Sequence, residues 1–278
     1  MFMRAFISAL FLLAFALPSL ALNHLFIYPL DEFATTPDRD HIRIGYAHTD
    51  ETSFLPNGNG LNFLGGKTIG RHLHAWGSGY ANRYFRSAVV HYNGEELRLS
   101  GTARYSSLSA GVGAHAEPID RLQLYARAGY SFHNTRYASD NLSGEKTVSS
   151  QTLDGYALLL GGSVFATPDL VLSANMNRST FNEDEYQTSF AINRFHVEMS
   201  YRILKDLKAS AGILMGELRS FNDRRDRTSA AHWTTPHARL EYRFSDPAAA
   251  YVEASRLNFE GEGDSTVGFA GGLRFFLR

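Results

Sequence analysis

The sequence predicts an all-β fold, a transmembrane antiparallel up-and-down β-barrel, and three observations support this prediction. Segments of roughly ten residues alternate apolar and polar side chains, which is the repeat unit of such a barrel. Short turns alternate with longer polar connections along the chain. Aromatic residues make up 13% of the sequence, yet after the N-terminus no apolar run is long enough for a membrane helix. A soluble β-sandwich could share the composition, but it has no reason to alternate its connections.

Residues 1–21 are expected to be a cleaved signal peptide. Met1–Arg4 is short and basic, Ala5–Leu17 is almost wholly apolar, and Ser19-Leu20-Ala21 supplies the small residues that a signal peptidase reads. The alternative is an uncleaved anchor helix, but this apolar run falls short of the about twenty residues that span a bilayer. We therefore expect the mature chain to begin at Leu22 and to lie beyond the inner membrane.

The rest of the chain divides into an irregular N-terminal strap, residues 22–40, and the barrel, residues 41–278. The strap shows no periodicity and carries two prolines and an acidic pair. His41–His48 alternates well enough for a first strand. Asp50–Gly79 is rich in Gly and Asn and predicts a long loop, within which Arg71–Trp76 could extend a strand.

Asn93-Gly94 decides the expected number of strands. This dipeptide is a strong two-residue hairpin signal between a strand-like Arg83–Tyr92 and an alternating segment that begins near Leu97. Twelve strands result if the hairpin spans the membrane, and ten if it lies in an outer loop. Both numbers are even, as single-chain bacterial barrels require, and we favour twelve.

Beyond Ala116 the alternation is regular. A bulge is expected near Ser255, where one strand keeps its register poorly. The expected strands are 122–132, 156–164, 170–176, 194–203, 207–215, 238–244, 248–259 and 266–277. The short turns, expected on the periplasmic side, are Glu117–Asp120, Thr167–Asp169, Leu204–Asp206 and Ser245–Pro247. The longer outer loops are expected at His133–Gln151, Phe181–Tyr186, Phe221–Thr228 and Glu260–Ser265.

The hairpin Arg194–Met215 shows the two faces most clearly. Phe195, Val197 and Met199 share an apolar face, and charged or polar residues occupy the opposite face. Ionisable residues on such polar faces are predicted to line the lumen, either as a plug of ion pairs or as the wall of a channel. These candidates are Arg127, Arg194, His196, Glu198, Arg202, Arg239, Glu241, Arg243 and Arg274.

No catalytic, cofactor or metal site is predicted. His196, Glu198 and Ser200 invite comparison with lipid hydrolases, but same-face neighbours on a strand lie almost 7 Å apart at about 3.3 Å per residue, too far for a nucleophile–base hydrogen bond. His72 and His74 lack an identifiable third metal ligand. No Cys, phosphate loop or dinucleotide fingerprint occurs. Arg224, Arg225 and Arg227 could contact lipopolysaccharide phosphates, although a solvated loop is the commoner explanation for such a run of charges.

The C-terminal segment Val267–Leu277 resembles the last strand of bacterial outer-membrane β-barrel proteins, small porin-like or OmpA-like barrels. In that family a Gly stands five residues before a terminal apolar residue, with a second apolar residue two before it. Gly272, Phe275 and Leu277 match these positions, whereas Arg278 follows where the family ends on an aromatic residue, and a polar residue is missing near Ala270. The resemblance implies an assembly signal for the barrel-assembly machinery.

These observations predict a non-enzymatic barrel in the outer membrane of a Gram-negative-type bacterium, either a small pore for hydrophilic solutes or a structural and surface-interaction protein. The alternatives are an outer-membrane lipid or lipopolysaccharide hydrolase and a soluble periplasmic β-sandwich binding protein. The net charge of −1 gives no reason to expect nucleic acid or an anionic lipid surface as partner. Expected partners are outer-membrane lipid and lipopolysaccharide, the assembly machinery during biogenesis, and a surface partner through the outer loops.

Overall fold

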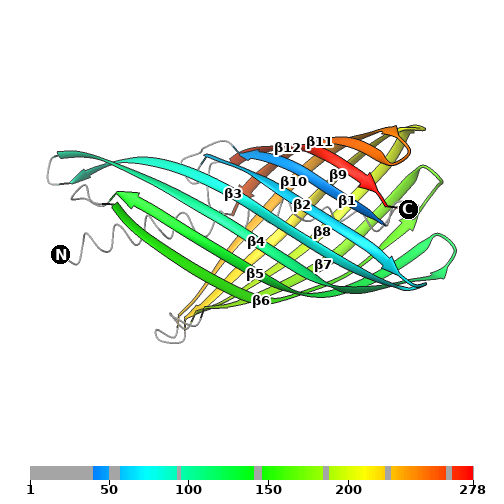
Figure 1. Cartoon of the computed structure of the whole chain (residues 1–278), viewed down its shortest axis with the longest axis horizontal. Helices are drawn as coiled ribbons and strands as arrows, with labels where there is room; N and C mark the ends of the chain where they lie inside the picture. Colours follow the sequence, from blue (N-terminus) through cyan, green and yellow to red (C-terminus); the bar gives the residue numbers. More distant parts are fainter. Residues whose placement is uncertain are drawn as a thin grey trace.

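A computed structural model describes residues 40–49, 57–92, 95–140, 146–183, 188–222, 227–260 and 265–277. In this part of the chain, twelve β-strands close into one antiparallel barrel, and they run obliquely around its axis (Figure 1). The strands are β1 (His41–Thr49), β2 (Asn57–Ile69), β3 (Leu73–Tyr92), β4 (Glu95–Ile119), β5 (Leu122–Asp140), β6 (Lys146–Phe165), β7 (Leu170–Glu183), β8 (Thr188–Leu204), β9 (Leu207–Asn222), β10 (Arg227–Ser245), β11 (Ala248–Phe259) and β12 (Ser265–Phe276).

Each strand pairs with its neighbour in sequence, and β1 closes the barrel by pairing with β12. Their register runs from His41 opposite Phe276 to Thr49 opposite Gly268. Closure pairs each described strand on both sides around the body of the barrel, which a bilayer requires because no water is present there to satisfy free backbone groups. The prediction of twelve strands is confirmed, and the alternative of ten is wrong. Asn93 and Gly94 lie outside the described residues, but the strands they join pair from Tyr92 opposite Glu95 onward.

The predicted loop Asp50–Gly79 is wrong in most of its length, since β2 occupies Asn57–Ile69 and β3 begins at Leu73. Its glycines make room for side chains from neighbouring strands. A Cβ on Gly60 would lie 1.7 Å from Oδ1 of Asn82, and a Cβ on Gly79 would lie 2.4 Å from Cε1 of Phe63. Glycine inside a strand can mark such a close approach, and here composition alone suggested a loop.

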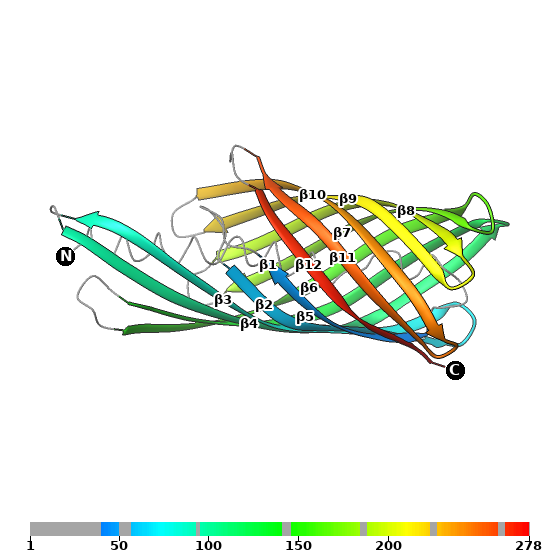
Figure 2. The ribbon, with the colours of Figure 1, turned by 90° about the horizontal axis from the view of Figure 1, so that it is seen from above.

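Short turns lie at Thr167–Asp169, Leu204–Asp206 and Ser245–Pro247 as predicted, whereas the turn predicted at Glu117–Asp120 is shifted to Asp120–Arg121 because β4 continues to Ile119. A fifth turn, around Gly70–His72, lies at the same end. At the other end the strands are longer than expected. Residues 133–140 and 146–151 belong to β5 and β6, so the predicted loop His133–Gln151 is mostly strand. In Figure 2, β3–β6 project beyond the other strands at the end away from the C-terminus. Polar residues can continue a ladder there because strand pairing needs backbone groups and not an apolar face.

The predicted bulge near Ser255 is also wrong. β11 keeps one register with β12 through Ser255, and the irregularity lies between Arg243 and Ser245 on β10. Near the outer end of β11 the usual alternation is reversed, because an apolar side chain points inward and a charged side chain points outward. Leu257 is buried inside the barrel while Arg256 faces outward.

The outer wall carries a broad apolar belt, and the inner wall is largely polar. Among the described residues no helix is long and apolar enough to cross a membrane. Large apolar side chains that are exposed on the outer wall include Ile44, Phe63, Leu108, Val112, Leu124, Phe132, Leu158, Leu160, Met176, Phe195, Met199, Leu240, Val252 and Phe269. A closed barrel with such a belt has the surface that a bilayer requires.

Candidate functional site

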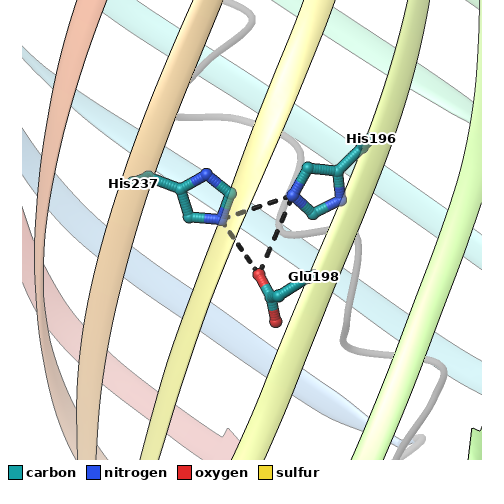
Figure 3. Close-up of side chains that lie close together, drawn as sticks. All are labelled: His196, Glu198 and His237. Atoms are coloured by element: carbon teal, nitrogen blue, oxygen red, sulfur yellow. Dashed lines mark hydrogen bonds and ion pairs between the residues drawn. The ribbon is translucent and has the colours of Figure 1, made fainter.

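The candidate site is a charged cluster on the inner wall of β8, β9 and β10. His196 and Glu198 on β8 and His237 on β10 point into the barrel and converge on one another (Figure 3). Glu198 is 1% exposed, whereas its strand neighbours Val197 and Met199, which point outward, are 40% and 50% exposed. This alternation is the strand periodicity that the sequence shows for β8.

Gly212 on β9 makes the contact between β8 and β10 possible. It is the register partner of Glu198 on one side and of His237 on the other. Since Gly212 has no side chain, the carboxylate and the imidazole meet across β9. A Cβ at this position would lie 2.8 Å from Cε1 of His237 and 2.5 Å from the carbonyl oxygen of Val197. The cluster therefore depends on a glycine whose strand contributes no charged group to it.

The two imidazoles and the carboxylate form a compact triangle of donor and acceptor atoms. Nε2 of His237 lies 3.1 Å from Oε2 of Glu198, and Nε2 of His196 lies 3.9 Å from the same oxygen. The two Nε2 atoms are 3.3 Å apart, and the rings stack with centroids 4.9 Å apart. All three atoms belong to buried or nearly buried side chains, so the interaction is screened little by water.

Glu198 has further partners that stabilise its charge. Nη2 of Arg239 lies 3.5 Å from Oε2, and the hydroxyl of Ser200 donates to Oε1 at 3.1 Å. Arg239 in turn pairs with Glu253 through Nε at 3.1 Å. A buried carboxylate is tolerated only when it is paired and hydrogen-bonded, and these contacts meet that condition.

The same three atoms could hold a transition metal ion. Bonds of 2.0–2.1 Å in a tetrahedral Zn²⁺ site place ligand atoms about 3.4 Å apart. The triangle of His196, Glu198 and His237 has edges of 3.1, 3.3 and 3.9 Å, close to one face of such a tetrahedron. Two imidazoles with one carboxylate are a donor set that Zn²⁺ accepts. Among the described residues, His196, Glu198 and His237 bring three potential ligand atoms within 4.8 Å of one another, whereas His72 and His74 belong to no such group of three.

Ser200 does not pair with a histidine among the described residues. The hydroxyl of Ser200 bonds Glu198 and, at 2.8 Å, the hydroxyl of Ser210 on β9. In the described part of the chain these are its side-chain partners, and neither is a histidine. The expectation that same-face neighbours lie too far apart for a hydrogen bond is wrong for Ser200 and Glu198, because side chains from alternate positions reach toward each other along the strand.

The other sequence-predicted lumen residues form further layers inside the barrel. Glu241 on β10 pairs with Nη2 of Arg274 at 3.2 Å and with Nζ of Lys208 at 3.8 Å. Arg127 lies with its guanidinium carbon 6.0 Å from the ring centre of Trp76, and Arg194 donates to Ser179 at 3.3 Å.

Two of the predicted lumen residues lie nearer the turn end of the barrel. Arg243 is half-buried and stacks on Phe276 at 4.5 Å. Arg202 is different from all the others. Half of its side chain is exposed, and it lies 3.7 Å from Asp169 beside a register shift at the end of β8. The shift interrupts the alternation, so Arg202 is not placed inside the barrel.

Sequence reasoning missed two features of the interior. His237 lies on a third strand, far from His196 in sequence, and only the register across Gly212 brings it to the cluster. The second is an apolar cluster on the inner wall toward the outer end, where polar faces were expected. It comprises Ala47, Tyr80, Tyr84, Ala103, Tyr105, Leu153, Phe181, Ile192, Leu218, Trp233 and Leu257. A strand whose inward-facing positions change from polar to apolar along its length could have indicated this apolar cluster.

The predicted assembly residues lie on the closing strand. Gly272 on β12 is the register partner of both Gly45 and Tyr251, and Phe275 and Leu277 are exposed on the outer wall. Their role as an assembly signal stays a prediction. Arg224 and Arg225 lie outside the described residues, and so does the side chain of Arg227.

Comparisons with known proteins agree on the fold. No family model matches the chain, and no curated protein matches it. Among solved structures, it resembles the transport unit of the autotransporter AIDA-I from Escherichia coli, with 11% identity and a TM-score of 0.54 over 91% of this chain and 94% of that chain. It also resembles the β domain of the Bordetella autotransporter Brka, with 12% identity and a TM-score of 0.52 over 85% and 98%.

A third similar structure is OmpT of Vibrio cholerae, with 11% identity and a TM-score of 0.48 over 86% of this chain and 97% of that chain. The likeness to the two autotransporter domains, whose TM-scores exceed 0.5, shows the fold alone. The chain is a β-barrel of the bacterial outer-membrane type. Its closed sheet and apolar belt assign it to the outer membrane of a Gram-negative-type bacterium.

Proposed function

We propose that the protein is a non-enzymatic outer-membrane barrel that forms a small pore for hydrophilic solutes, narrowed by the His196–Glu198–His237 cluster. The observation that supports this most is the contrast between its two walls. The outer wall is apolar, whereas the inner wall carries charged groups in successive layers, from Arg274 near the turn end to Arg194 further along. Charged groups on an inner wall favour the passage of water and ions over that of apolar molecules.

The layers also suggest why the pore would be small. Glu241 with Arg274 and Lys208 forms one layer, and Glu198 with the two histidines and Arg239 forms the next. Toward the outer end, the apolar cluster that contains Phe181 and Ile192 covers part of the inner wall. Hydrophobic constrictions of this kind can gate a pore by excluding water. We therefore expect low conductance, with the charged and apolar layers acting in series.

Planar bilayer recording of the purified full chain tests this proposal. Discrete conductance steps are expected, and they should become larger in Glu198→Ala, which shortens a side chain at the narrow layer. Glu217→Ala is the matched control, because Glu217 points outward on β9 and pairs with Arg219 at 2.7 Å. A heat-modifiable shift on a gel establishes that each variant is folded. If the folded wild-type protein inserts into the bilayer and no conductance steps are recorded, the proposal of a pore is refuted.

A second candidate, a surface-interaction protein, is favoured by the projecting strands β3–β6 (Figure 2). A pore does not need some of its strands to continue so far beyond the neighbouring strands. This version predicts that shortening β3 and β4 by equal lengths around residues 93–94 abolishes adhesion of cells to a target surface while conductance is retained. Unchanged adhesion in the shortened variant would refute it.

A further inference from the structure

A row of arginines crosses the outer wall on β3, β4 and β5. Arg83 is the register partner of Arg104, and Arg104 is the register partner of Arg136. All three side chains are exposed on the outer face. Directly opposite residues on antiparallel strands have Cβ atoms about 5 Å apart, so three positive charges stand next to one another.

This arrangement is unfavourable without an external anion. Like charges placed directly opposite each other destabilise a sheet. In the described part of the chain no carboxylate forms an ion pair with any of the three arginines, and the row continues into neutral residues, Asn59 on β2 and Ser150 on β6. The acidic groups that balance the protein's overall charge therefore lie elsewhere, and the row remains a local concentration of positive charge.

The row lies just beyond the apolar belt, at the end of the barrel opposite the short turns. On β4 Leu108 stands four residues from Arg104, and on β5 Phe132 stands four residues from Arg136, each more than half exposed. At about 3.3 Å of rise per residue on a tilted strand, the row is roughly 10 Å above these belt residues. Short turns mark the periplasmic end, so the row faces the head groups of the outer leaflet.

A groove of about 640 Å³ lies over the same part of the wall. The three arginines line it together with Asn59 and Asn134, which can donate hydrogen bonds through their amides. Tyr46 and Leu61, two exposed side chains that belong to the belt, also line it. The groove thus combines cationic and amide donors with an apolar wall, which is the chemistry of an anionic amphiphile.

We propose that this groove binds the phosphorylated head of an outer-leaflet glycolipid, with its phosphates on Arg83, Arg104 and Arg136. Guanidinium groups bind phosphate through charge-assisted, often bidentate hydrogen bonds, and two or more of them on one phosphorylated head group relieve the repulsion within the row. An acyl chain of the same lipid lies along Leu61 and Tyr46. A free inorganic phosphate would satisfy the arginines but would leave this apolar wall unused. The site is separate from the lumen and does not depend on whether the barrel conducts.

The test measures binding of bisphosphorylated lipid A to the detergent-solubilised full chain by native mass spectrometry. Lipid A without phosphates and inorganic phosphate serve as the two comparison ligands. The triple variant Arg83→Gln, Arg104→Gln, Arg136→Gln is expected to lose affinity for lipid A by about tenfold or more. The matched control Arg178→Gln, Arg219→Gln, Arg256→Gln removes the same charge from exposed outer positions and should change affinity less than twofold.

Three results would overturn the proposal: equal binding of lipid A to the triple variant and the wild type, equal binding of the phosphate-free lipid, or displacement of lipid A by inorganic phosphate at equal concentration. Thermal unfolding gives a second readout that a merely structural role would not produce. Without lipid A, the triple variant should unfold at a higher temperature than the wild type, because the repulsion among the arginines is removed. With lipid A present, the triple variant should unfold at a lower temperature than the wild type, because it no longer binds the lipid. If the triple variant does not fold, the single change Arg104→Gln, at the centre of the row, carries both measurements.

Discussion

Replacing Glu198 by alanine is the sharpest test of the ion network inside the barrel. The carboxylate lies within 4 Å of three cationic or potentially cationic side chains, His237 at 3.1 Å, Arg239 at 3.5 Å and His196 at 3.9 Å. Removing one partner of a buried ion pair typically destabilises a protein by about 3–5 kcal/mol, because the other charge is left uncompensated. Arg239 keeps its contact with Glu253, so we expect a loss near the lower limit, about 3 kcal/mol.

Denaturant unfolding in detergent micelles or lipid vesicles measures this loss. The chain has two tryptophans, Trp76 and Trp233, and both are buried, so their fluorescence reports the transition. Glu198→Gln keeps the shape of the side chain and should lose less than Glu198→Ala.

The matched control is Glu217→Ala on the outer wall, where a surface ion pair contributes about 1 kcal/mol or less. A loss in Glu198→Ala no larger than that of Glu217→Ala would refute the claim that the lumen network stabilises the barrel.

Four further predictions concern the same molecule. Gly212→Ala should destabilise the barrel by about 1–3 kcal/mol because its Cβ would meet His237 and the Val197 carbonyl, whereas Gly77→Ala, whose Cβ would have its nearest neighbour at 3.7 Å, should change the free energy of unfolding much less. Zn²⁺ should bind the folded barrel with one-to-one stoichiometry in calorimetry, and His237→Ala should abolish that heat; an unchanged titration would exclude the cluster as the ligand set. Burial acts to raise the pKa of Asp40, but the hydrogen bonds from Thr68 and the nearby Lys67 ammonium hold it below its usual value. The stability that Asp40 contributes should therefore be complete above about pH 4 and be lost as the pH falls through the lowered pKa, and Asp40→Asn should remove this dependence between pH 5 and 2. Finally, His196→Ala and Ser200→Ala should leave the acylation pattern of outer-membrane lipids unchanged by mass spectrometry, and an altered pattern would favour the hydrolase.

The sequence predicted the architecture well where one face of a strand meets lipid. Phe195, Val197 and Met199 are apolar because the bilayer requires it, and their alternation with Arg194 and Glu198 reveals both the strand and its orientation. Where the wall leaves the membrane, that requirement ends. The continuation of β5 and β6 into polar residues, and the inward Leu257 beside the outward Arg256, were therefore predicted poorly.

The arginine row shows a second limit of sequence reasoning. Lipopolysaccharide was an expected partner, but the net charge of −1 gave no indication that three arginines lie side by side on β3, β4 and β5. They are about twenty to thirty residues apart in the chain, and only the strand register makes them neighbours. Total charge says nothing of such a local concentration.

The sequence by itself determined that this chain forms a barrel, which wall faces the bilayer, and at which end the short turns lie. Those properties depend on side-chain period and turn length, which are local. The tertiary structure decided which inner residues meet. Glu198 contacts His237 because Gly212 lies between them in register, and Gly60 on β2 leaves room for the Asn82 side chain from β3. Contacts across strands depend on how the strands are aligned, and a single strand's period carries no information on that alignment.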